Sequence, residues 1–184
     1  RVIDRPMRPL FPKDYRNDVT LNNMVMAVDP DCTPELTAMI GSAIAVAVSD
    51  IPFDGPTSTT QVGLIDGEFV FNPNAAQREV SDLQLTVAST RDKVIMIEAG
   101  ANEVPEAKMI EAIFAAHDLN QEVIAFFDTI VAECGKPKHE YQSFAVPQEL
   151  FDAIQEIVPA AEMEEAVFTD DKQTREENIR VITE

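Results

Sequence analysis

The fold is decided by the stretch Thr60-Gln61-Val62-Gly63-Leu64-Ile65-Asp66-Gly67-Glu68-Phe69-Val70-Phe71. Two runs rich in β-branched and aromatic residues flank an Asp-Gly pair, which tolerates the positive φ that a tight hairpin turn requires. Asn72-Pro73-Asn74 ends the pattern. The stretch therefore predicts a tight β-hairpin.

Three further segments are expected to form strands. Residues 83–88 and 94–98 flank Arg91-Asp92-Lys93 and predict a second hairpin. Residues 19–28 are rich in Val, Met and Thr and end at Asp29-Pro30-Asp31, which predicts a strand followed by a turn. The expected order is one strand, a helix, and then four strands.

Two helices are expected to pack on the sheet. Thr33-Pro34-Glu35 indicates a helix start, with Thr33 as the cap, and small residues thin one side of the helix as it runs to Ile51. A longer helix is expected from about Pro105 to Cys134, with one apolar stripe and a left-handed cap at Gly135. His117-Asp118-Leu119-Asn120 predicts a bend or break within it.

The composition changes after this helix. Residues 136–145 are polar and interrupt the periodicity, and from Lys136 to the end there are 12 acids and 5 bases. Helical patterns follow at 147–158, at 160–168 and from 170 onward. We predict an α+β sheet-and-helix domain over residues 1–137 and the beginning of an all-α segment over residues 138–184.

Composition also limits the function. The chain has 14 Lys and Arg against 33 Asp and Glu, a net charge of −19, which repels nucleic acid over most of the surface. Cys32 and Cys134 lack metal-ligand spacing, and we expect both to be reduced and buried in a cytoplasmic protein. The sequence contains no run of eighteen apolar residues, the length that a membrane-spanning helix needs. Because the chain begins and ends in mid-pattern, we expect it to be a piece of a longer protein.

The first twelve residues, Arg1 to Pro12, gather three arginines in this acidic chain. A local cluster of positive charges on a negatively charged protein is typical of a specific anion-binding site. The same arginines fit equally well as surface charges on a short helical turn.

No self-contained active site is visible among the usual motifs. Walker, zinc-ligand and dinucleotide-binding patterns are absent. Scattered carboxylates at Asp50, Asp54, Asp66 and Asp82 each lie beside a turn signal, where a solvated loop is the simpler interpretation. The two histidines, His117 and His139, are isolated in sequence.

The opening run, Arg1-Val2-Ile3-Asp4-Arg5-Pro6-Met7-Arg8-Pro9-Leu10-Phe11-Pro12, closely resembles polynucleotide phosphorylase, in the first of its two ribonuclease PH-like domains. Further matches follow in order: Val28-Asp29-Pro30-Asp31, Ala38-Met39-Ile40-Gly41-Ser42, Gly55-Pro56, Val62-Gly63-Leu64-Ile65-Asp66-Gly67-Glu68, and Ala132-Glu133-Cys134-Gly135-Lys136-Pro137-Lys138. The acidic segment beyond them looks like the start of the family's α-helical linker.

This resemblance implies a bacterial 3′-to-5′ exoribonuclease that uses inorganic phosphate to release nucleoside diphosphates from RNA. It also implies a homotrimer with a central RNA channel, partners in RNA degradation, and magnesium at an active site outside this chain. Family members that catalyse hold phosphate at a turn before a helix and use acidic and Lys positions in a later strand. Here the positions that look equivalent are Glu35, Gln84 and Thr86. A carboxylate repels phosphate, and neither a neutral amide nor a hydroxyl replaces Asp or Lys.

The resemblance therefore predicts a non-catalytic, RNA-guiding and assembly domain with no catalytic or metal-binding residue. Arg5 and Arg8, between restrained prolines, are expected to contact the RNA backbone, and Arg1 to a smaller degree. The alternative is that one arginine ties down Asp4 or a helix end. Two other functions remain open: a stand-alone catalytic ribonuclease PH-type subunit, and an acidic protein-interaction module without an RNA role.

Overall fold

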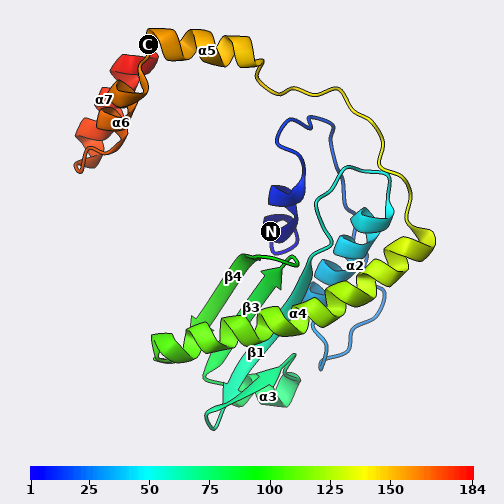
Figure 1. The fold of residues 1–184 in the computed structure, drawn as a ribbon. Helices are drawn as coiled ribbons and strands as arrows, with labels where there is room; N and C mark the ends of the chain where they lie inside the picture. The colour runs from blue at the N-terminus through cyan, green and yellow to red at the C-terminus, as the bar shows by residue number, and fades with distance from the viewer. The chain divides into compact units, whose positions relative to one another are not determined.

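An antiparallel sheet of four strands, in the order β2-β1-β3-β4, is the centre of the first part of the chain (Figure 1). The computed structural model describes residues 1–184, in two units, Arg1–Gln142 and Ser143–Glu184. The strands are β1 (Ser58–Ile65), β2 (Glu68–Phe71), β3 (Leu83–Ser89) and β4 (Val94–Ala101). Both predicted hairpins are confirmed. In the first, Ile65 pairs with Glu68 across a turn where Asp66 and Gly67 have φ of 52° and 83°.

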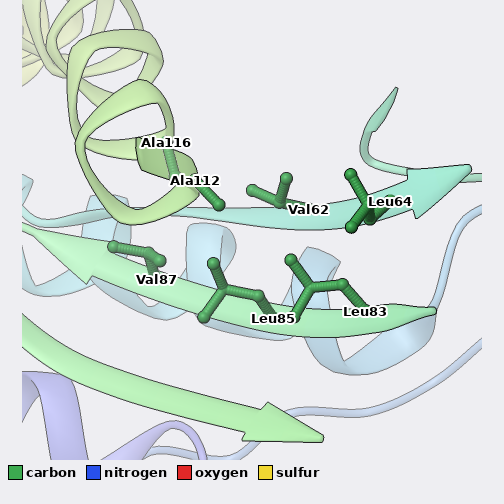
Figure 2. Packing of buried hydrophobic residues seen from close by; sticks show 7 residues of the cluster. All are labelled: Val62, Leu64, Leu83, Leu85, Val87, Ala112 and Ala116. Carbon is green, nitrogen blue, oxygen red and sulfur yellow. The ribbon is translucent and has the colours of Figure 1, made fainter. Parts of the chain in front are cut away.

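The helix α4 (Glu106–Cys134) packs across one face of the sheet (Figure 1). Its Ala112 and Ala116 are fully buried against strand side chains that alternate along β1 and β3 (Figure 2). Those side chains are Val62, Leu64, Leu83, Leu85 and Val87. Burying an aliphatic side chain of this size contributes about 1.5–3 kcal/mol, so this cluster is the main apolar core. Alanines on the helix let its backbone approach the strands closely.

The other face of the sheet receives the helix α2 (Pro34–Val48) and the N-terminal segment. Met39 of α2 packs with Ala88 and Met96, whose side chains alternate with the α4-facing ones, and Val2 and Ile3 pack against the same cluster. The N-terminal segment comprises α1 (Asp4–Met7) and a 3-10 turn, η1 (Arg8–Leu10). It is thus attached to the sheet that it precedes in sequence.

Asn120 explains why the expected bend in α4 is wrong. The helix is continuous, and Asn120 is completely buried because three groups of the sheet satisfy its amide. Its Oδ1 accepts from Thr60 Oγ1 at 2.9 Å, and its Nδ2 donates to the Val87 carbonyl at 3.2 Å and to Ser89 Oγ at 3.1 Å. A polar residue that looks like a helix breaker in sequence therefore joins α4 to β1 and β3.

Four further expectations are wrong. Residues 19–28 form no strand, and Met24 and Met26 are 81% and 84% exposed. Cys32 and Cys134 are free thiols, as expected, but both are exposed. Thr33 occupies the N-cap position of α2, yet its hydroxyl makes no cap bond and is buried without a partner. Gly135 ends α4 with φ of −68°, so no left-handed cap forms.

A short helix that sequence patterns did not indicate, α3 (Ala75–Val80), follows β2. It begins with a capping box in which the Asn74 side chain accepts from the Gln77 amide, and the Gln77 side chain accepts from the Asn74 amide, both at 2.9 Å. At six residues, it lacks the apolar periodicity that a longer helix would show.

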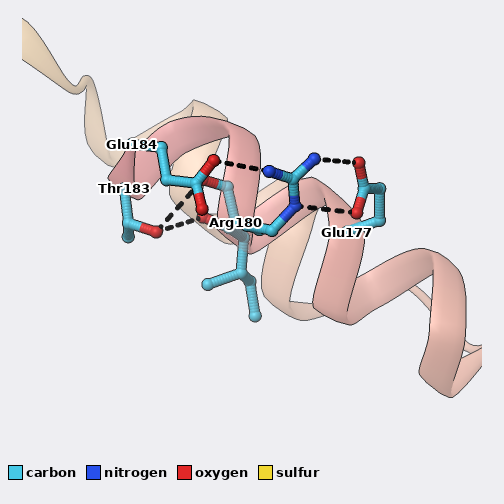
Figure 3. Close-up of polar contacts among 5 residues, drawn as sticks. Glu177, Arg180, Thr183 and Glu184 are labelled. Carbon is cyan, nitrogen blue, oxygen red and sulfur yellow. Dashed lines mark hydrogen bonds and ion pairs between the residues drawn. The ribbon is translucent and has the colours of Figure 1, made fainter.

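The second unit is helical, as predicted: α5 (Gln148–Ile157), α6 (Ala160–Val167) and α7 (Lys172–Thr183). Asp171 caps α7 by accepting from the Thr174 amide at 2.8 Å. Near the other end of α7, Arg180 bonds both oxygens of Glu177 and also reaches Glu184 (Figure 3). None of the helices combines the length with the hydropathy that crossing a lipid bilayer requires.

Candidate functional site

The N-terminal segment that carries the predicted arginines is fixed to the first unit by its buried residues and by contacts with the loop at residues 53–54. Pro6, Met7 and Leu10 are buried. The Leu10 carbonyl accepts from the Asp54 amide at 2.8 Å, and the Phe11 and Phe53 ring centroids lie 5.0 Å apart. The positions of Arg5 and Arg8 therefore follow from packing that neither arginine makes itself.

Each of these two arginines already has a carboxylate partner. Arg8 donates to both oxygens of Asp4, from Nε at 3.0 Å and from a terminal nitrogen at 2.6 Å. This hydrogen bonding, together with the charge of Asp4, raises the pKa of the Arg8 guanidinium above its usual value. Arg5 donates to Glu98 of β4 at 3.1 Å. The tie to Asp4, the alternative role considered for these arginines, is thus present in Arg8.

A surface cavity of about 810 Å³ lies beside this segment. Four cationic side chains, Arg1, Arg8, Lys13 and Arg16, and two acidic ones, Asp4 and Asp18, are among its lining residues. We call it the N-terminal groove. Arg5 is not among its lining residues, so the groove brings together only two of the three predicted arginines.

Lys13 and Arg16 are the groove residues that sequence reasoning missed. Both are exposed, and neither has a carboxylate within ion-pair distance. The sequence signal that points to them is the clustering of positive charges near the N-terminus. Residues 1–16 hold five of the chain's 14 Lys and Arg.

Tyr15, between these two cations, is held by residues from beyond α4. Its hydroxyl lies 3.3 Å from His139 Nε2, and its ring meets Tyr141 edge-on at a centroid distance of 5.0 Å. Tyr141 in turn donates to Asp14 Oδ1 at 3.0 Å. Partial desolvation, followed by the bond to Asp14, raises the pKa of the Tyr141 hydroxyl. We call Asp14, Tyr15, His139 and Tyr141 the tyrosine clasp.

Lys138 attaches the segment that follows α4, residues 136–141, to the C-terminal end of α2. Its ammonium donates to the carbonyls of Val46, Ala47 and Ser49 at 3.2, 2.9 and 2.7 Å. These are carbonyls at the negative end of the helix, where a cation is favourable. Desolvation lowers the pKa of Lys138, and the charge of Asp50 acts in the opposite direction. Residues 136–141 consequently belong to the packed structure of the first unit.

The positions compared with catalytic residues offer no magnesium site. Glu35 is exposed in the first turn of α2, and Gln84 is exposed on β3. Thr86 is half-buried, and its register partner on β4 is Glu98, the carboxylate paired with Arg5. Magnesium prefers carboxylate oxygens, and the two strand positions, Gln84 and Thr86, supply one amide and one hydroxyl, while the single carboxylate, Glu35, lies on α2. The residues present therefore do not fit the metal.

Asp82, the remaining acid near this strand, faces Asn102 at 3.5 Å. No group of three or more His, Cys, Asp and Glu residues is placed to hold a metal ion. Among the carboxylates of the first unit, Asp4, Glu98 and Asp128 pair with arginines.

Comparisons with known proteins agree with this geometry. A family model described as "3′ exoribonuclease family, domain 2" matches residues 55–118, which span β1 to the first part of α4. The crystal structure of rice (Oryza sativa) Rrp46 has a TM-score of 0.51 at 15% identity, covering 57% of this chain and 51% of that one. This likeness and the family match confirm the predicted α+β, ribonuclease PH-like fold.

Longer relatives match the whole chain. The polyribonucleotide nucleotidyltransferase of Lachnoclostridium phytofermentans is 78% identical over 99% of this chain and 26% of its own length. Those of Clostridioides difficile and Staphylococcus epidermidis are 47% and 45% identical over 100% of this chain and 26% of theirs. The chain thus spans about a quarter of the length of these curated relatives. The resemblance to polynucleotide phosphorylase is confirmed, because the chain is similar from end to end to one segment of the polyribonucleotide nucleotidyltransferases.

Proposed function

We propose that this chain is the non-catalytic, RNA-guiding and assembly part of a 3′-to-5′ phosphorolytic exoribonuclease. The whole enzyme releases nucleoside diphosphates from RNA with inorganic phosphate as co-substrate. The observation that carries the proposal is the end-to-end similarity to polyribonucleotide nucleotidyltransferases, at up to 78% identity. The absence of an acid or a lysine at Gln84 and Thr86 supports the non-catalytic assignment.

Several finer features belong to the same proposal. Magnesium acts outside this chain, and the full-length protein is a cytoplasmic homotrimer that works with RNA-degradation partners. Residues 1–137 form the first ribonuclease PH-like domain, and residues 138–184 begin the helical linker. Residues 138–141, at the start of this linker, pack against the first unit, and the compact helical unit begins at Ser143.

Phosphorolysis tests the enzymatic assignment. The 184-residue chain and the full-length protein are incubated with a 5′-labelled RNA, magnesium and inorganic phosphate. We expect nucleoside diphosphates from the full-length protein and none from the chain. Release of diphosphates by the chain alone would overturn the assignment and favour a catalytic subunit.

RNA binding tests the arginines. Arg8 lines the groove, and its side chain is 77% exposed, so its guanidinium can exchange Asp4 for a phosphate. For Arg8→Ala in the full-length protein, we expect weaker RNA binding. We also expect the slope of log affinity against log salt to become shallower by about 0.7, the value for one phosphate contact on a single strand. Unchanged affinity and slope in both Arg8→Ala and Arg5→Ala would remove these residues from the RNA path.

A further inference from the structure

We propose that Lys13 and Arg16 are phosphate-binding residues, and that they hold a single-stranded RNA backbone in the N-terminal groove. This inference rests on the proposed RNA-guiding function and assigns the contact to residues outside the arginine run. Its basis is the difference between cations that are already paired and cations that are not.

Charge pairing separates the two groups. Arg5 must give up Glu98, and Arg8 must give up Asp4, before either can bind phosphate with its full charge. Lys13 and Arg16 have no carboxylate to give up. One terminal nitrogen of Arg16 donates to the carbonyls of Lys13 and Tyr15 at 2.6 and 3.3 Å, which orients the guanidinium without neutralising it. A phosphate that binds Lys13 or Arg16 therefore does not have to displace a carboxylate.

The groove also differs in charge from the other cavities of the first unit. Four cations and two carboxylates line it, an excess of two positive charges. The cavity between β1, β3 and α3 has one charge of each sign, from Arg78 and Glu79. The cavity on the outer side of α4 has one lysine and two acids. In a chain with a net charge of −19, the groove is the one of these three cavities that suits a polyanion.

The tyrosine clasp makes this part of the groove pre-organised. Tyr15 lies between Lys13 and Arg16, and His139 and Tyr141 hold its side chain. His139 is itself fixed by its amide, which donates to the Asp50 carbonyl at 2.7 Å. The backbone that carries both cations therefore loses little conformational freedom when RNA binds.

The test is direct binding of a 5′-fluorescein-labelled oligoadenylate of twelve nucleotides to the 184-residue chain over a series of salt concentrations. We expect Lys13→Gln/Arg16→Gln to bind about tenfold more weakly at low salt. The salt slope should become shallower by about 1.4, the value for two lost contacts. The matched control, Lys108→Gln/Lys172→Gln, removes the same charge from α4 and α7, and its affinity and slope should equal those of the parent chain.

Three outcomes would overturn the inference. One is a groove variant that behaves like the control, and another is a weaker affinity with an unchanged slope, which would indicate a structural effect. The third is a parent chain that does not bind the oligonucleotide. Arg8→Ala, measured in parallel, separates this inference from the proposed function. Loss of slope in Arg8→Ala but not in the groove variant rejects Lys13 and Arg16 alone. Lys13→Arg/Arg16→Lys should restore the parent slope.

Discussion

Replacing Asn120 with alanine tests the polar junction between α4 and the sheet. The substitution removes three hydrogen bonds and leaves two buried hydroxyls, those of Thr60 and Ser89, together with the Val87 carbonyl. A buried polar group that loses its partner costs about 1–3 kcal/mol. Since hydroxyls can rotate toward other acceptors, we use about 1 kcal/mol for each group. Alanine's higher helix propensity offsets about 0.6 kcal/mol, so we expect a net loss of about 2.5 kcal/mol.

The assay is urea unfolding followed by tyrosine fluorescence. The chain has no Trp, and both tyrosines, Tyr15 and Tyr141, lie in the first unit, so the signal reports that unit alone. Thr60→Val is the matched variant, because it keeps the side-chain shape and strips a single bond from Asn120. We expect it to lose about 1 kcal/mol.

A double-mutant cycle between Asn120 and Thr60 tests whether their hydrogen bond stabilises the fold. If Asn120 and Thr60 stabilise each other through their bond, the double variant loses less than the sum of the single variants. We expect Asn120→Ala to lower the free energy of unfolding by about 2.5 kcal/mol, because three buried groups lose their partner. A loss below about 1 kcal/mol would refute the stabilising role of the Asn120 hydrogen bonds. Strict additivity of the two substitutions would refute the pairing.

Two pH-dependent predictions follow from side chains that hold their neighbours. Bonds from Thr174 to Asp171 lower the pKa of that carboxyl, so its stabilisation of α7 is present above the ordinary value of 3.8 and is lost as pH falls through the folded-state pKa. Ellipticity at 222 nm should show this loss, and Asp171→Ala should remove that pH dependence; an unchanged profile would contradict the cap. Tyr141 has the opposite sign: desolvation, followed by the bond to Asp14, raises its pKa, so the stabilisation from its neutral hydroxyl is fully present below the ordinary value of 10.0 and is lost as pH rises through the folded-state pKa. Absorbance at 295 nm should show a late tyrosinate step that disappears in Tyr141→Phe; its persistence in the variant would refute the assignment.

The sheet could be predicted because its signals are local. Asp66-Gly67 specifies the turn, and once Ile65 faces Glu68, the alternation of the two strands fixes the remaining pairs of this hairpin. The expected strand at residues 19–28 was wrong for a related reason. Residue preference favours an extended backbone, but a strand also needs a neighbour for its amides and carbonyls, and this segment has none in the chain.

The missed features depend on contacts between distant residues. Asn120 resembles a helix breaker in sequence, and only the sheet groups around it explain its burial in a continuous helix. Similarly, Tyr15 and His139 are 124 residues apart, so no spacing rule could connect them. The pairing of Arg8 with Asp4 is different, since an (i, i+4) pair on a helical turn follows from sequence spacing alone.

The acidic body and the cationic groove make opposite contributions to RNA binding, and salt separates them. Repulsion from a chain of net charge −19 extends about 10 Å at 0.1 M salt and weakens as salt rises. Phosphate contacts at Lys13 and Arg16 act at hydrogen-bond distance, and salt opposes them because binding releases counterions from the RNA. If the contacts dominate, affinity falls with salt; if repulsion dominates, affinity rises. The sign of the slope in the parent chain therefore measures whether the groove overcomes the charge of the body around it.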